Sequence, residues 1–152
     1  MVGESEGQAF LWIDPQLTHI NSGEAYGIND NDQVIYSHDQ SFFLYQNGVS
    51  EKLNGLSNAA GINNSGQIAG ANSSIHPVLY SSNGTIDLGI TGGSRAINDK
   101  GWVVGTGLFA GGYHGFIFDG TVHDLGTLSG TSSSAATAVN SYGDVVGFSD
   151  NA

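Results

Sequence analysis

Ile28-Asn29 is the first of four matching dipeptides, and Ile62-Asn63, Ile97-Asn98 and Val139-Asn140 follow it at similar intervals. Each dipeptide precedes a short β-branched run that ends in a small residue. A second set of runs keeps the same spacing: Ala9-Phe10-Leu11-Trp12, Phe42-Phe43-Leu44-Tyr45, Pro77-Val78-Leu79-Tyr80 and Gly115-Phe116-Ile117-Phe118. Self-similarity at a fixed period indicates a repeat architecture, here of four units of about 35 residues.

The segments between these recurring dipeptides and runs favour β-strands over helices. Helical repeats of similar length need apolar residues at three- and four-residue spacing over at least about ten positions, and such segments are absent. Instead, Gly, Asn-Gly or Asp-Gly interrupts the chain roughly every 8–12 residues, and the runs between are β-branched or aromatic. This pattern therefore predicts four short strands in each unit, and the first strand ends at the recurring Ile-Asn or Val-Asn dipeptide.

Two kinds of turn recur in these units. The third and fourth strands are joined by dipeptides that tolerate positive φ and suit a tight hairpin, namely Asn47-Gly48, Asn83-Gly84 and Asp119-Gly120. The first strand is followed by Asn-x-x-Gly in three units, beginning at Asn63, Asn98 and Asn140, and by Asp32 in place of Gly in the other. The Asn side chain of such a turn can bond the backbone two residues on.

Composition agrees with one all-β domain. The chain has 152 residues, enough to bury a core, and its 24 Gly and 2 Pro accompany regular apolar runs and not low-complexity sequence. We expect residues 1–152 to form a single repeat domain, with units at approximately 2–34, 35–68, 69–103 and 104–146, and with residues 147–152 restarting the pattern.

Four-stranded antiparallel units repeated around an axis make a β-propeller. The sequence therefore predicts four four-stranded blades, closed into a ring by pairing of the N- and C-terminal segments. Met1-Val2-Gly3-Glu4-Ser5 repeats Val145-Val146-Gly147-Phe148-Ser149, which gives the closing blade one strand too many. The alternative is therefore a part of a larger propeller or β-repeat array that oligomerisation completes.

These columns resemble the HAF-type extracellular repeat, whose units read roughly as His-Ala-Phe-Leu-Tyr, an Asn-Gly turn, Asp-Leu-Gly-Thr-Leu-Gly-Gly and Ala-x-x-Ile-Asn. The matching segments include Gln8 to Trp12, His76 to Tyr80, Asp87 to Gly93 and Asp124 to Gly130, whereas the first two units depart at the Asp-Leu-Gly segment. The resemblance implies an extracellular or cell-surface parent protein and brings no catalytic residues. Residues 1–20 lack the charged start and apolar core of a signal peptide.

Charge and composition exclude several partners. The net charge is −11, with three basic residues in all, so no basic patch is available for nucleic acid. No apolar stretch is long enough for membrane insertion. The chain has no cysteine, which excludes disulfides and thiolate metal sites.

Candidate catalytic and metal sites are not supported either. Of the five histidines, only His76 and His114 share a repeat position, and no serine lies in a nucleophile elbow. The turn Asn29-Asp30-Asn31-Asp32 has oxygen ligands like a calcium loop but lacks a later bidentate Glu, and hairpin chemistry explains it and its sibling turns. We expect a protein that is not an enzyme and holds no cofactor or metal.

Candidate ligand-binding residues lie in the links that vary between units, because variable loops on a rigid scaffold commonly carry recognition. The longest such link runs from Thr106 to His114 and contains several aromatic residues. Arg95 follows Gly92-Gly93-Ser94, whose backbone N–H groups could receive an anion, although a surface salt bridge is the alternative. The candidate residues are Phe109, Tyr113, His114, His76, His38, Tyr26 and Arg95.

We therefore expect a non-catalytic binding module that recognises a glycan or protein through variable loops on one face. One alternative is a structural, self-assembling unit that forms a homo-oligomer through the redundant terminal strand. Another is a small-molecule binder in a central channel near Tyr26, Arg95 and Thr137.

Overall fold

The computed structural model describes residues 7–150, which form sixteen β-strands and no helix. No helix capable of spanning a membrane is therefore present in this range. The strands are β1 (Gln8–Ile13), β2 (Gln16–Ser22), β3 (Glu24–Ile28), β4 (Val34–His38), β5 (Ser41–Gln46), β6 (Val49–Lys52), β7 (Asn58–Ile62), β8 (Ile68–Ala71), β9 (Pro77–Ser81), β10 (Gly84–Asp87), β11 (Gly92–Ile97), β12 (Val103–Phe109), β13 (Gly112–Phe118), β14 (Val122–Asp124), β15 (Ser133–Val139) and β16 (Val145–Asp150).

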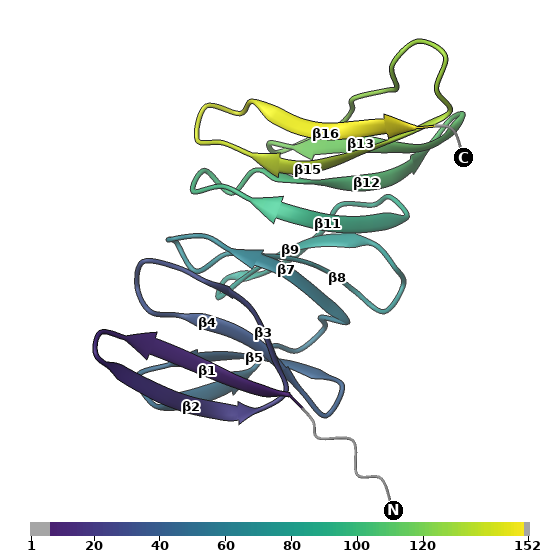
Figure 1. Ribbon diagram of the computed structural model, residues 1–152. Coiled ribbons are helices and arrows are strands. Elements are labelled where there is room, and N and C mark those ends of the chain that lie inside the picture. The colour runs from purple at the N-terminus through teal and green to yellow at the C-terminus, as the bar shows by residue number, and fades with distance from the viewer. Residues whose placement is uncertain (1–6, 151–152) are drawn as a thin grey trace, which may run out of the picture.

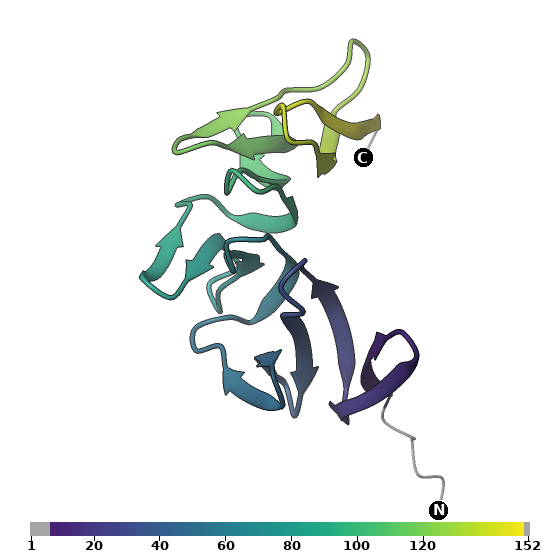
Figure 2. The same ribbon diagram turned by 90° about the vertical axis from the view of Figure 1, so that its left-hand side faces the viewer.

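The strands form three complete sheets and two incomplete ones. Strands β3–β6, β7–β10 and β11–β14 each make an antiparallel four-stranded sheet in chain order. Strands β1–β2 and β15–β16 each make a separate two-stranded sheet, here called the N-terminal and C-terminal half-sheets. The sheets stack in chain order, so that the two half-sheets lie at opposite ends of an elongated molecule (Figures 1 and 2). The predicted all-β fold with four-stranded antiparallel sheets is confirmed.

The hydrophobic core lies between successive sheets. One cluster joins the first and second complete sheets through residues such as Ile35, Leu53 and Ile68. A second cluster joins the second and third through residues such as Leu79, Leu88 and Phe116. Each sheet therefore depends on its neighbour to cover its apolar face, as in other repeat proteins.

A ladder of asparagine side chains runs along the stack. The Nδ2 of Asn29 donates to the carbonyl of Asn63 at 2.9 Å, Asn63 to Asn98 at 3.0 Å, and Asn98 to Asn140 at 2.8 Å. Each Oδ1 accepts backbone N–H groups two and four residues ahead, which closes its own turn. The first three asparagines are buried. We call this series the asparagine ladder.

The local turn chemistry follows the sequence. Asp32 has a φ of 56°, close to the positive φ of its glycine counterparts Gly66 and Gly101. Asn47 and Gly48 also have positive φ, as the tight hairpin between β5 and β6 requires. The first strand of each complete sheet and of the C-terminal half-sheet has a β-bulge, and the bulged residues are Tyr26, Ala60, Arg95 and Thr137.

Closure of a four-bladed ring stays a prediction. Between residues 7 and 150 the two half-sheets do not pair with each other, and Figure 1 places them at opposite ends. Together they hold the four strands of one sheet, because β15–β16 match the first two strands of a unit and β1–β2 match the last two. The surplus strand expected at Met1 to Ser5 lies outside the described residues.

The asparagine ladder can be tested within this chain. We expect Asn63→Ala to lower the free energy of unfolding by about 0.5–1.5 kcal/mol more than Asn140→Ala, because it also removes the buried side-chain hydrogen bond to the Asn98 carbonyl, which keeps only the Gly101 N–H. Asn140 is an exposed, matched control that makes the same turn bonds but donates to no further repeat in the described chain. Urea denaturation of the monomer measures both values. Equal losses would mean that the turn bonds alone account for the effect.

Candidate functional site

The two histidines that share a repeat position make hydrogen-bond contacts with aspartates. His76 Nδ1 lies 3.0 Å from Asp87 Oδ2, and His114 Nδ1 lies 2.9 Å from Asp124 Oδ1. Each aspartate also accepts the backbone N–H two residues ahead, from Gly89 and Gly126, at 2.8 Å. The pairs tie the start of the third strand to the end of the fourth. The recurrent Asp-Leu-Gly segment was the sequence signal for these aspartates, which the candidate residues omitted.

The other polar candidates make separate local contacts. His38 Nδ1 lies 2.9 Å from Ser22 Oγ, and its Nε2 lies 3.3 Å from Asp39. The hydroxyl of Tyr26 donates to Glu24 at 3.2 Å. Arg95 is exposed at its bulge on β11 and has no ion pair with any residue between 7 and 150, so the expected salt bridge is not seen there. These candidates do not converge on one site.

The predicted long loop from Thr106 to His114 is instead an extended β-hairpin. Strands β12 and β13 pair through to Phe109 and Gly112, with the turn at residues 110–111. Gly111 and Gly112 both have positive φ, which permits this tight reversal. On one face the Phe109 and His114 rings stack with centroids 6.0 Å apart. Leu108 and Tyr113 are paired on the other face and are about half exposed.

No cluster of three or more His, Cys, Asp or Glu side chains capable of holding a metal occurs in the described part of the chain. Asp30, in the turn considered for calcium, instead bonds Asn64 of the next turn: Asn64 Nδ2 lies 2.7 Å from the carboxylate of Asp30 and 3.2 Å from that of Asp99, in the turn after it. These hydrogen bonds link the turns of successive sheets.

The half-sheets present the most unusual surface of the molecule. Comparison with a complete sheet shows which strand pairing each end lacks. In the complete sheet, Val103 of β12 opposes Ile97 on one side and Phe118 on the other. Val145 of β16 opposes Val139 in the same way, but its other side faces no strand in residues 7–150. Trp12 of β1 occupies the position of Phe118. Strand β16 thus corresponds to the second strand of a unit and β1 to the third, and the edges that would pair with each other are both free.

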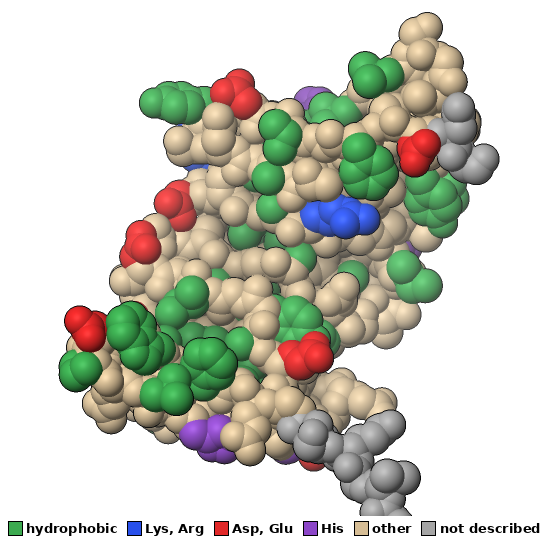
Figure 3. All heavy atoms as spheres, in the orientation of Figure 1, with side chains coloured by type: hydrophobic (Ala, Val, Ile, Leu, Met, Phe, Trp, Pro, Cys, Tyr) green, Lys and Arg blue, Asp and Glu red, His purple; other side chains and the backbone are tan. Residues whose placement is uncertain are grey.

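Side chains on these edges are exposed where their counterparts are buried. Phe10 is 60% exposed, whereas Val78 and Phe116 at the same repeat position are 0% exposed. Val146 is 62% exposed, whereas its counterparts are 0% exposed, namely Ile35, Ala69 and Val104. Hydrophobic side chains gather at the end that carries β1 and β2 (Figure 3). The incomplete ends therefore expose residues that the repeat normally places in its core.

Three cavities lie beside the exposed edges. The cavity at the C-terminal end has a volume of about 390 Å³ and is lined by Leu125, Ala135 and Gly147 among others. At the N-terminal end, a cavity of about 290 Å³ includes Leu11 and Ile28, and one of about 470 Å³ includes Ala9 and Ala25 among other residues.

The C-terminal cavity corresponds to the place of a missing aromatic ring. In the complete sheet, Phe116 opposes Gly105, and a Cβ on Gly105 would lie 3.0 Å from the Phe116 ring. Gly147 is the counterpart of Gly105; it pairs with Ala136 of β15, and no strand of the described chain lies on its other side. Leu125 is 47% exposed beside it, whereas its counterpart Leu88 is 8% exposed.

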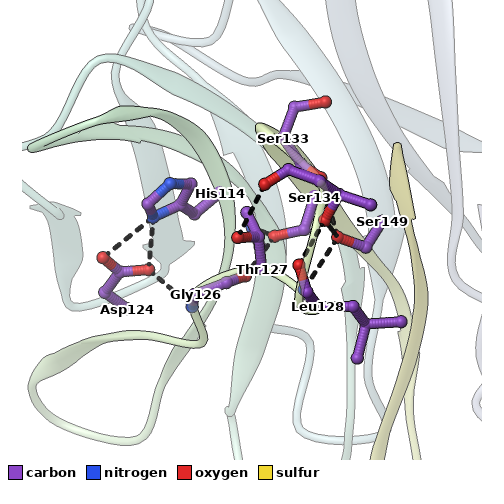
Figure 4. A network of polar contacts seen from close by, with 10 residues as sticks. His114, Asp124, Gly126, Thr127, Leu128, Ser133, Ser134 and Ser149 are labelled. Carbon is purple, nitrogen blue, oxygen red and sulfur yellow. Dashed lines mark hydrogen bonds and ion pairs between the residues drawn. The ribbon is translucent and has the colours of Figure 1, made fainter. Parts of the chain in front are cut away.

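Polar contacts hold the wall of this cavity in place (Figure 4). The Leu128 N–H donates to Ser149 Oγ at 3.0 Å, and Ser149 Oγ donates to the Ser133 carbonyl at 2.9 Å. The Gly115 N–H donates to Ser134 Oγ at 2.8 Å, and Ser134 Oγ donates to the Gly126 carbonyl. The loop between β14 and β15 is thereby fixed against β15 and β16, so the cavity is already formed in the isolated chain.

No protein-family model matches this chain, and a search of curated proteins gave no match either. The resemblance to HAF-type repeats therefore stays a prediction from the sequence.

The His–Asp contacts predict a pH dependence. The backbone N–H of Gly89, followed by the His76 side chain, holds the pKa of the Asp87 carboxyl below its ordinary value of 3.8. Asp87 thus stabilises the fold above its ordinary pKa, and this contribution is lost as the pH falls through the lowered pKa. We expect Asp87→Ala to lower the melting temperature at pH 7, and the difference from wild type to shrink below about pH 3.

Thermal unfolding followed by circular dichroism between neutral and acid pH measures this difference. Glu51→Ala, at an exposed position of β6, is the matched control and should change the melting temperature little. A difference between wild type and Asp87→Ala that stays constant down to the lowest pH would contradict the assignment.

Proposed function

We propose that this chain is a non-catalytic structural module of the β-propeller type, whose two half-sheets join to complete a four-stranded sheet. The observation that carries the proposal is the exposure of Phe10 and Val146, since Phe43 is half-buried and their other repeat counterparts are fully buried. The completed sheet would have β15 and β16 as its first two strands and β1 and β2 as its last two.

The chemistry of the edges supports this proposal. Natural sheets protect free edges with charged residues, proline or bulges. The fourth strands β6, β10 and β14, which are the outer edges of the complete sheets, all carry charged residues such as Glu51, Asp87 and Asp124. Strand β1 carries no charged residue, and β16 carries only Asp150 at its end. Edges of this composition suit pairing with another strand.

Joining of the half-sheets is compatible with several assemblies. Within one chain it would close the four-bladed ring, and between chains or adjacent repeats it would build a larger propeller or array. The resemblance to HAF-type repeats favours an extracellular or cell-surface setting for such a module. All these forms share one contact, the antiparallel pairing of β16 with β1.

The pairing predicts its own register. Because Val103 opposes Phe118, and Ile68 opposes Tyr80, Val145 should oppose Trp12. Opposed residues of antiparallel strands have Cα separations within the range of a disulfide. We expect the W12C/V145C variant to form a disulfide under mild oxidation, measured on non-reducing gels and by peptide mass mapping.

The W12C/F148C variant is the matched control, because this pair is three residues out of register. Trp12 and Phe148 are both more than half exposed, and the natural chain has no cysteine, so neither variant offers a competing thiol. Equal disulfide yields from both variants, or none from W12C/V145C, would contradict the proposed pairing.

A second candidate function is recognition of a glycan or protein by the extended hairpin of β12 and β13. The exposed Leu108 and Tyr113, directly opposite each other, support this proposal. Aromatic stacking contributes roughly 0.5–1.5 kcal/mol, so Tyr113→Ala should weaken binding of any glycan found on an array by about three- to tenfold. Tyr142→Ala, at an 83% exposed tyrosine on another turn, is the control. Unchanged affinity of the Tyr113→Ala variant would exclude the hairpin as the recognition surface.

A further inference from the structure

We propose that a second copy of this chain supplies the missing half-sheet, so that β16 of one copy pairs with β1 of the next in a head-to-tail assembly. This inference rests on the proposed joining of half-sheets and names the partner. It also predicts which side chain enters which cavity.

The position of the ends favours a second copy over closure within one chain. Three complete sheets separate the half-sheets, which lie at opposite ends of the stack in both views (Figures 1 and 2). The ladder hydrogen bonds and the cores between sheets fix how successive sheets stack. A second copy placed at either end continues this stacking and requires no change within the chain.

The register seats the exposed side chains in the cavities. With Trp12 opposite Val145, Phe10 lies opposite Gly147, which is the relation of Phe116 to Gly105. The Phe10 ring would therefore fill the 390 Å³ cavity beside Leu125. Its exposed surface and the exposed surface of Leu125 would become buried together.

The C-terminal half-sheet fills the other two cavities in return. Val146 would lie opposite Leu11, as Val104 lies opposite Ile117, and its side chain would enter the 290 Å³ cavity that Leu11 lines. Phe148 would lie opposite Ala9 and enter the 470 Å³ cavity that Ala9 lines. Phe148 is 56% exposed in the single chain, although it stands in the middle of a strand.

The asparagine ladder also has two open ends that match. Nδ2 of Asn29 and of Asn63 donates to a side chain four residues ahead and also to the next ladder carbonyl. Asn140 Nδ2 makes the first of these bonds, to Asp144 at 2.8 Å, and has no ladder acceptor in the described chain. At the other end, no ladder asparagine in the described chain donates to the carbonyl of Asn29. Head-to-tail stacking would bring Asn140 of one copy to Asn29 of the next.

The two surfaces of this contact differ, so the interface is heterologous. Such contacts form open chains, or rings if the rotation closes. An open assembly of any length keeps one free β1 edge at one end and one free β16 edge at the other, so the mass should increase with protein concentration. This polarity allows a decisive mixing experiment.

The experiment uses the full 152-residue chain with one damaged end. Phe10→Asp places a charge in the interface from the β1 side, and Val146→Asp does so from the β16 side. Both positions are at least 60% exposed in the single chain, so neither substitution disturbs its core. Circular dichroism checks that both variants fold, and light scattering after size exclusion measures their mass over a concentration series.

We expect the wild-type mass to rise with concentration and each variant alone to remain a monomer. An equimolar mixture of the two variants should form a dimer with one copy of each, because each variant retains the edge that the other needs, and this dimer should not grow. Native mass spectrometry identifies its composition. Ile86→Asp, at an exposed position of β10, is the control and should assemble like wild type.

The proposal that a second copy supplies the half-sheet would be overturned if the wild-type chain is monomeric at every concentration and the mixture of variants forms no dimer. If the W12C/V145C variant then forms its disulfide within one chain, ring closure is correct and only the second copy fails. If it forms no disulfide, the joining of half-sheets fails as well. A wild-type dimer abolished by only one of the two substitutions would indicate a symmetric contact and also overturn the proposal.

Discussion

The asparagine ladder is the interaction on which the rest of the structure depends. The side chains of Asn29, Asn63 and Asn98 each use their oxygen to close their own turn and their nitrogen to donate to the carbonyl of the next turn. A local turn and the distance between successive sheets are therefore fixed by one buried side chain. Asn29, Asn63 and Asn98 are buried, so their hydrogen bonds between sheets are shielded from water.

This arrangement makes the molecule nearly one-dimensional. Every sheet packs on the sheet before it and the sheet after it, so the ends are the places where the repeat is unsatisfied. Repeat proteins commonly cover their ends with polar terminal units, but here the ends expose Phe10, Val146 and Phe148. The incomplete ends carry complementary halves of one sheet, and this is the basis of the proposed assembly.

Residues that differ between the repeat units make local structural contacts in the described part of the chain. His76 and His114 pair with aspartates that also cap the following turns. The long segment around Phe109 extends a hairpin whose inner face is covered by an aromatic stack. Arg95 stands apart at a bulge, exposed and without an ion pair in residues 7–150, and together with Tyr113 it is a position where recognition can be sought.

The sequence by itself determined the all-β fold and its turns, because these depend on local conformational preferences and strand alternation. It also indicated that the terminal strands match, although it assigned the function to variable loops. Only the tertiary structure decided that Asn63 reaches the carbonyl of Asn98, that Asp87 partners His76 and that Phe10 lies exposed. These contacts join residues from different strands or sheets, and spacing along the chain does not specify how sheets stack or which ends meet.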